Sequence, residues 1–205
     1  MNRQFEPSEL VTATDGTPYH IRIRPEALAD NVILVGDPAR VDLIAGKLDK
    51  VGDKTSNREI VSCKGEYKGK PITVLSTGMG VGCIDIVVNE LDICANVDLE
   101  KREPKPVHRS LNLIRIGTCG SLQDDLEVGT HVASAYAIGI DGLAYYYKGL
   151  EKINDEKLIE QFLKQTSWDK KLPYPYAVKA DNELLNRIAS DTHKGIAITA
   201  PGFYA

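Results

Sequence analysis

The stretch NVILVGDPARV, residues 31–41, decides the fold class of this 205-residue chain. Asn31 to Gly36 form a short apolar run that is rich in β-branched residues and ends in glycine, which is typical of a buried strand in a parallel sheet. Asp37 can cap a helix and Pro38 favours its first position, and apolar residues then recur at helical spacing. The stretch therefore predicts a strand, a tight turn and a helix.

A second unit of this kind follows a hairpin. Two strand-like runs, residues 59–67 and 71–77, are separated by the turn-prone sequence KGK and predict the hairpin. The glycine-rich stretch 78–82 comes next, and residues 84–94 then place their apolar side chains on one face of a predicted helix.

The remainder of the chain continues the alternation. Residues 99–110 carry six charged groups and two prolines and predict an exposed connection. Further strands are predicted at residues 111–117, 130–140 and 195–199, and further helices at 155–165 and 181–190. The pattern predicts a single α/β domain over residues 1–205, with a central mixed, largely parallel β-sheet flanked by helices.

Composition and charge exclude several classes of function. A net charge of -4 gives no basic excess for binding nucleic acid. No apolar run approaches the ~20 residues that span a membrane, and the first twenty residues lack a secretory signal. The four cysteines and four histidines show no metal-ligand spacing, no C-x-x-C pair and no Cys/His pairing. We expect a soluble protein of the reducing cytoplasm that uses neither metal nor covalent catalysis.

Glycines at the predicted strand ends mark the place where α/β sheets bind ligands, although glycine is equally common there because the chain must turn. They match neither the dinucleotide nor the nucleoside triphosphate fingerprint. Arg115 lies inside an apolar run, where its charge needs an anion, and an internal carboxylate is the alternative partner. Together with Arg40, Arg58 and Thr118 it could form a phosphate cage, because guanidinium groups bind phosphate oxygens in pairs. Arg40 and Arg58 could equally be surface residues, and His20 could be a packing or a surface residue.

Four motifs together resemble the nucleoside phosphorylase family: VGDPARV (35–41), SNRE (56–59), STGMGVG (76–82) and LIRIGTCGSL (113–122). The resemblance runs from His20 to Tyr204. It is greatest to the uridine phosphorylases, because Asp141-Gly142 follows a strand, the motif GFY stands at residues 202–204 and the amino-terminal half is similar in general. Members of this family use inorganic phosphate to split a nucleoside into ribose 1-phosphate and a free base, in nucleoside salvage.

The resemblance also implies which residues form the site. The phosphate site would comprise the backbone of Gly36 and the side chains of Arg40, Arg58, Arg115 and Thr118. The catalytic residues among them would be Arg40, Arg115 and Thr118. The nucleoside would contact His20, Thr118, Cys119, Gly120 and Phe203. Arg58 and His20 would act in a neighbouring subunit, which implies a homodimer as the smallest competent unit and in some relatives a hexamer of dimers.

The resemblance implies no metal or organic cofactor, since phosphate is a co-substrate. Some uridine phosphorylases hold a monovalent cation through a glutamate that corresponds to Glu59, but Cys83 stands where that family has a serine. Relatives continue beyond GFY with residues that read the base and hold the ribose, so we expect this chain to lack the family's C-terminal portion. Purine nucleoside phosphorylase activity is one alternative, and a phosphate-binding protein without activity is another.

Overall fold

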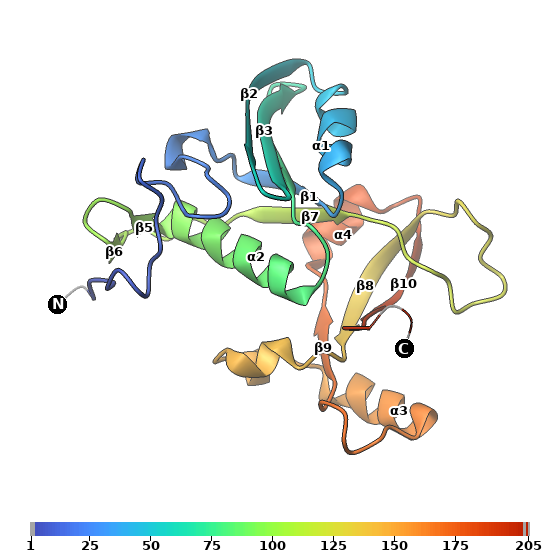
Figure 1. Ribbon diagram of the computed structural model, residues 1–205. Coiled ribbons are helices and arrows are strands. Elements are labelled where there is room, and N and C mark those ends of the chain that lie inside the picture. Colours follow the sequence, from blue (N-terminus) through green and yellow to red (C-terminus); the bar gives the residue numbers. More distant parts are fainter. Residues whose placement is uncertain (1–2, 203, 205) are drawn as a thin grey trace. The chain divides into compact units, whose positions relative to one another are not determined.

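The computed structural model describes residues 3–202 and 204 of the chain (Figure 1). The contacts within the chain divide it into two compact units, Met1–Cys119 and Gly120–Ala205. One domain over residues 1–205 therefore stays a prediction.

A five-stranded mixed sheet organises the first unit. Its order is β2 (Lys50–Asn57), β3 (Ile60–Tyr67), β4 (Lys70–Ser76), β1 (Asn31–Val35) and β7 (Asn112–Ile116). Strand β1 lies between β4 and β7 and pairs in parallel with both, whereas β2, β3 and β4 are antiparallel neighbours. The sheet thus has a parallel half, which ends at one edge, and a hairpin half.

Helices α1 (Pro38–Ala45) and α2 (Val81–Asn96) cover opposite faces of this sheet. Alternate residues of β1 point to opposite faces. Val32 and Leu34 pack in a buried cluster with Leu91 of α2, whereas Val35 packs in a second cluster with Val41 of α1. The prediction of helices on both sides of a sheet is confirmed for this unit.

The second unit contains a smaller mixed sheet in the order β10 (His193–Thr199), β8 (Val132–Gly139) and β9 (Tyr176–Lys179). Strand β8 is parallel to β10 and antiparallel to β9. Helix α3 (Glu156–Thr166) buries Ile159 against Ile138 and Ala177 of this sheet. Helix α4 (Asn182–Ile188) lies between β9 and β10 in the sequence.

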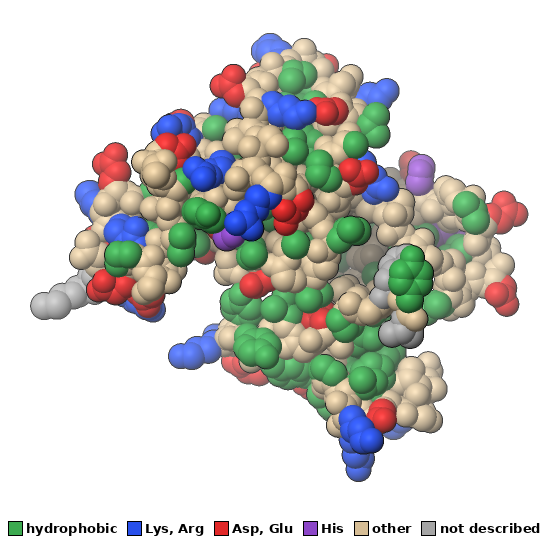
Figure 2. All heavy atoms as spheres, in the orientation of Figure 1, with side chains coloured by type: hydrophobic (Ala, Val, Ile, Leu, Met, Phe, Trp, Pro, Cys, Tyr) green, Lys and Arg blue, Asp and Glu red, His purple; other side chains and the backbone are tan. Residues whose placement is uncertain are grey.

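Shorter elements complete the two units. They are the 3-10 helices η1 (Pro25–Ala27), η2 (Leu143–Tyr146) and η3 (Leu150–Lys152), and the two-stranded pair β5 (Val97–Asp98) and β6 (Glu103–Pro104). In the described part of the chain, no helix combines the length and the apolar character needed to cross a membrane. On the face drawn in Figure 2, cationic and anionic side chains are interspersed.

The structure confirms the predicted α/β alternation but adds four strands, of which β5 and β6 have only two residues each. Strand β2, with the sequence KVGDKTSN, is almost entirely exposed at the edge of its sheet, so it carries no apolar signal. Strand β9 has only four residues, which is too short for an alternation of apolar and polar residues to predict it. The prediction that residues 111–117 form a buried run is wrong in its burial, because β7 is the outermost strand and Arg115 and Ile116 are exposed.

Candidate functional site

The three parallel strands of the first unit end in register. Val35 lies opposite Ser76 on one side and Ile116 on the other. The backbone N–H of Thr77 donates to the carbonyl oxygen of Val35 at 2.8 Å, and the Thr77 hydroxyl donates to the same oxygen at 3.2 Å. The residues that follow the strands are Gly36, Thr77-Gly78 and Gly117. The glycine turns predicted from the sequence are therefore brought to one edge of the sheet.

The guanidinium of Arg115 lies over this edge. A Cβ atom on Gly36 would be 3.7 Å from Nη2 of Arg115 and 3.8 Å from the carbonyl oxygen of Gly78. A Cβ atom on Gly117 would collide with Nη1 of Arg115 and would lie 3.3 Å from its Cζ. The absence of side chains at Gly36 and Gly117 thus leaves room for the guanidinium to fold back over the strand ends.

The charge of Arg115 is not neutralised by an internal carboxylate. No ion pair or side-chain hydrogen bond of Arg115 occurs among the residues that the structure describes. The internal-carboxylate alternative is therefore not observed. The argument that a buried charge demands a partner is also wrong here, because Arg115 is exposed. An exposed guanidinium without an internal carboxylate partner can still bind an anion.

Two helix N-termini follow the glycine turns. Asp37 caps α1, since its Oδ1 accepts from the N–H of Ala39 at 2.9 Å, and half-buried Arg40 is in the first turn of that helix. Helix α2 starts after Gly80, which has a φ of 90° and offers no side-chain cap. The first N–H groups of α2 therefore keep their hydrogen-bonding capacity, and the helix dipole adds positive potential.

Arg58 and Glu59 form the turn between β2 and β3. Arg58 is exposed and adopts a φ of 57°, which is uncommon for a residue with a side chain. Within the described residues, neither Arg40 nor Arg58 has an ion pair or a side-chain hydrogen bond. The structure thus unites Arg115 with the glycines, while the roles of Arg40 and Arg58 stay predictions.

Glu59 contacts the glycine turn through its side chain. A Cβ atom on Gly78, whose φ is 72°, would lie only 2.8 Å from Cγ of Glu59. The thiol of Cys83 donates to Oε1 of Glu59 at 3.7 Å. Burial raises the pKa of the Cys83 thiol, and the charge of Glu59 and their hydrogen bond raise it further. The cation predicted at Glu59 is untested, and no cluster of three potential metal ligands occurs among the described residues.

We expect Cys83 to be alkylated slowly by iodoacetamide at pH 8 compared with the exposed Cys119, because only the thiolate reacts. Its rate should continue to rise above pH 9, the ordinary thiol pKa, since the raised pKa delays ionisation. Mass spectrometry of peptides after timed alkylation measures both rates. If the alkylation rate of Cys83 levels off below pH 9, the pKa of its thiol is not raised, and the burial of Cys83 beside Glu59 is contradicted.

His20 is held by a residue that the sequence analysis missed. Nδ1 of His20 is 2.6 Å from Oε1 of Glu90, a residue of α2 that is only 8% exposed. Helical spacing places Glu90 beside Val87 and Cys94 on the apolar face of α2, and a carboxylate on such a face was the available signal. His20 is half-buried and interacts through its ring, so it is neither a free surface residue nor an apolar packing residue.

The other predicted nucleoside contacts are less defined. Thr118 and Cys119 are exposed beyond the end of β7. Gly120 belongs to the second unit, and Phe203 lies outside the described residues. The nucleoside contacts assigned to these four residues remain predictions.

The Asp141-Gly142 pair has a structural role in the second unit. Asp141 accepts from the hydroxyl of Tyr176 at 2.9 Å and from the N–H of Leu143 at 2.7 Å, and Gly142 adopts a φ of 78°. Burial and the bond to Asp141 raise the pKa of Tyr176, so its hydroxyl stays a donor. The pair Asp141-Gly142 therefore stabilises the turn into η2, and this structural role explains the two residues without a contact to a substrate.

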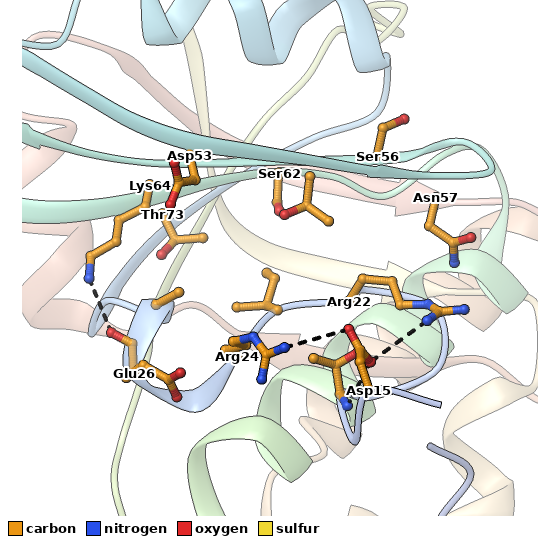
Figure 3. A pocket seen from close by; sticks show the side chains of 14 residues that line it. Asp15, Arg22, Arg24, Glu26, Asp53, Ser56, Asn57, Ser62, Lys64 and Thr73 are labelled. Carbon is orange, nitrogen blue, oxygen red and sulfur yellow. Dashed lines mark hydrogen bonds and ion pairs between the residues drawn. The ribbon is translucent and has the colours of Figure 1, made fainter. Parts of the chain in front are cut away.

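A separate polar cavity of about 750 Å³ lies in the first unit, between the N-terminal segment and the β2–β3 hairpin (Figure 3). Asp15 lies 3.8 Å from Arg22 and 3.9 Å from Arg24 in its wall. Hydrogen bonds from Thr17, followed by these arginines, lower the pKa of Asp15. None of the predicted phosphate-site residues lines this cavity. Its two arginines lie near Asp15, and Lys64 donates to the carbonyl oxygen of Glu26 at 3.1 Å, whereas Arg115 has no such partner among the described residues.

A sequence model of the Phosphorylase superfamily matches residues 30–205. The chain belongs to this family. It is 30% identical to a uridine phosphorylase of Thermococcus kodakarensis over 151 residues, which is 74% of this chain and 50% of the relative. It is 38% identical to a DeoD-type purine nucleoside phosphorylase of Bacillus thuringiensis over 110 residues, which is 53% of this chain and 41% of the relative. The chain thus spans about half the length of the curated relatives it matches.

A solved structure supports the same assignment. A Trypanosoma brucei nucleoside phosphorylase, described as showing uridine phosphorylase activity, superposes with a TM-score of 0.79 at 28% identity. The match covers 95% of this chain and 70% of that protein. The predicted resemblance to the nucleoside phosphorylases is confirmed at the level of the family and of the fold.

Proposed function

We propose that the protein is a pentosyltransferase that splits a nucleoside, uridine first among them, with inorganic phosphate. The observation that supports this most strongly is the guanidinium of Arg115 above Gly36 and Gly117, which has no ion pair among the described residues. The glycine turn beside it, from Gly78, leads into the N-terminus of α2, which has no side-chain cap. Guanidinium forks and free backbone amides together favour an oxyanion. Membership of the Phosphorylase superfamily supports inorganic phosphate as that anion.

The proposed chemistry needs position and charge from the protein. Arg115, Arg40 and the Thr118 hydroxyl would bind the phosphate dianion with the N–H of Gly36. As the bond from ribose C1′ to the base nitrogen breaks, the departing base takes the electron pair and the sugar acquires oxocarbenium character. The bound phosphate stabilises this positive charge and its oxygen forms the new bond to C1′, giving ribose 1-phosphate. The proton of the hydrogen phosphate ion ends on the departing base nitrogen, so that atoms and charge balance without a metal or an organic cofactor.

We propose a homodimer as the smallest active unit, in which Arg58 and His20 serve the neighbouring subunit's site. The exposed position of Arg58 at a hairpin tip suits a residue that reaches outward. A hexamer of such dimers, a role in nucleoside salvage and a place in the cytoplasm complete the proposal.

Uridine is proposed as the first substrate because the Thermococcus kodakarensis relative matches a longer part of this chain than the purine-specific one. A purine nucleoside is the second candidate, since the Bacillus thuringiensis relative is more identical over its shorter match. A buried donor or acceptor left unpaired by the wrong base costs about 1–3 kcal/mol, so base selection is decided by a few polar contacts.

The test is to incubate the protein with uridine or inosine, with and without inorganic phosphate, and to measure free base by chromatography. Phosphate-dependent release of uracil is the expected result. Phosphate-dependent release of hypoxanthine alone would replace uridine by a purine nucleoside. Equal release without phosphate would replace phosphorolysis by hydrolysis. No release, with phosphate bound in calorimetry, would leave a phosphate-binding protein without activity.

Replacing Gly117 by alanine provides a test of the guanidinium's position. We expect Gly117→Ala to raise the KM for phosphate at least about tenfold, because the new methyl group must displace Arg115. The free energy of unfolding should change by less than about 1 kcal/mol, since the displaced group is the end of an exposed side chain. Steady-state kinetics and urea unfolding measure the two quantities.

Gly195→Ala in β10 is the matched control, because its new Cβ would lie 3.7 Å from Val132, an ordinary contact. An unchanged KM for phosphate in Gly117→Ala would remove the assigned role of the Arg115 guanidinium. A shared rise in both variants would point to a general effect of losing a glycine.

A further inference from the structure

One buried carboxylate collects three N–H donors around His20. Oε2 of Glu90 accepts from the backbone N–H of His20 and from that of Ile21, both at 2.8 Å. Oε1 of Glu90 lies 2.6 Å from the ring Nδ1 of His20. Since α2 supplies Glu90 and packs against the sheet through Leu91, this carboxylate is fixed to the core of the first unit.

The contact with Glu90 determines which ring nitrogen carries the proton. An ionised carboxylate only accepts hydrogen bonds, so Nδ1 must donate at a separation of 2.6 Å. In the neutral imidazole the lone pair then belongs to Nε2, and the adjacent negative charge makes it a better acceptor. No other hydrogen bond to the His20 ring occurs in the described part of the chain. Nε2 is therefore left free to accept from a hydroxyl.

Asn57 fixes the same segment from the hairpin. Its side-chain amide donates to the carbonyl oxygen of His20 at 2.9 Å and to that of Tyr19 at 3.2 Å. Asn57 is the last residue of β2 and directly precedes Arg58. His20 is thus held by Glu90 through its N–H groups and by Asn57 through its carbonyl, and its position is linked to that of Arg58.

We infer that Glu90 is a positioning residue, which fixes the tautomer and orientation of His20 so that Nε2 accepts a hydrogen bond from the ribose 5′-hydroxyl. This inference rests on the proposed function. It assigns a substrate-directed role to a residue that does not itself touch the substrate. A purely structural role, in which Glu90 only anchors the backbone at residues 20 and 21, predicts different results in the two measurements below.

The first measurement is independent of activity. With ¹⁵N-labelled histidine, long-range ¹H–¹⁵N spectra of the wild-type protein should show the neutral His20 ring protonated at Nδ1. Glu90→Gln should convert a large part of this signal to the form protonated at Nε2, because the glutamine amide can donate to Nδ1. A wild-type ring protonated at Nε2, or an unchanged tautomer in Glu90→Gln, would overturn the inference.

The second measurement compares uridine with 5′-deoxyuridine, which lacks the hydroxyl in question. We expect Glu90→Gln to lower kcat/KM for uridine about tenfold, which is the range of one hydrogen bond, and to leave kcat/KM for 5′-deoxyuridine within about twofold. His20→Ala should show the same selectivity. The double variant His20→Ala, Glu90→Gln should lose little more kcat/KM for uridine than either single variant, since both changes remove the same interaction.

Asp92→Asn is the matched control, because it makes the same carboxylate-to-amide change on the exposed face of α2, where Asp92 accepts from Asn96 at 2.7 Å. Its kcat/KM for both substrates should equal the wild-type values. Equal losses on both substrates in Glu90→Gln would leave only the structural role. A wild-type protein that releases no base from either nucleoside would instead refute the proposed function, while the tautomer measurement would still stand.

Discussion

Arg115→Ala is expected to lower the rate of phosphate-dependent base release by about 10³-fold. The guanidinium is the charged group that the structure brings over the ends of β1 and β7, and no carboxylate competes for it in the described part of the chain. In the proposed reaction, phosphate acts as both the stabilising anion and the nucleophile, so loss of this group removes binding and alignment together. Steady-state kinetics with varied phosphate would give kcat and KM separately.

Arg115→Lys distinguishes charge from geometry at the same position. Lysine keeps the positive charge but lacks the planar fork, so we expect it to restore only part of the activity. Arg187→Ala is the control, because Arg187 is an exposed residue of α4 that pairs with Glu183 at 2.8 Å. The free energy of unfolding should be unchanged in both Arg115 variants, since Arg115 makes no ion pair among the described residues. In Arg187→Ala it should fall by no more than about 0.5 kcal/mol, the contribution of the exposed pair with Glu183. Near-normal turnover in Arg115→Ala would refute the phosphate role.

The parallel half of the first sheet could be predicted from the sequence because its signals are local. The run NVILV became β1, and the capping residue Asp37 begins α1 as its position indicated. The glycines at the strand ends were also informative, since the registers of β4, β1 and β7 bring them to one edge. The exposed strand β2 could not be predicted in this way, because an edge strand of polar residues has no buried face to create a pattern.

The roles assigned to the candidate site residues stay predictions, and the expected burial of Arg115 was wrong. Arg115 was selected because an arginine in an apolar run was expected to be buried, yet β7 lies at the edge of the sheet and leaves it exposed. The order of the strands in a sheet depends on residues that are far apart in the sequence, so it cannot be predicted from a run of five residues. Glu90 was missed for the opposite reason, because its partner His20 is 70 residues away in the sequence.

Leu91→Ala is expected to lower the free energy of unfolding by about 3 kcal/mol, the ordinary loss when a buried leucine leaves a cavity. Leu91 is 0% exposed and packs in the cluster that joins α2 to the sheet. The residue next to it, Glu90, holds His20, and the glycine turn at the start of α2 faces the candidate phosphate site. Urea unfolding followed by circular dichroism would measure the loss.

Leu43→Ala in α1 is the matched control, because the same side chain is 69% exposed there and should change stability by less than about 0.5 kcal/mol. Below the unfolding transition, Leu91→Ala should also keep the His20 tautomer found in the wild-type protein, since its neighbour Glu90 is unaltered. Equal stability losses in Leu91→Ala and Leu43→Ala would contradict the packing of α2 on the sheet. An altered tautomer in the folded Leu91→Ala protein would show that Glu90 depends on this core residue for its position.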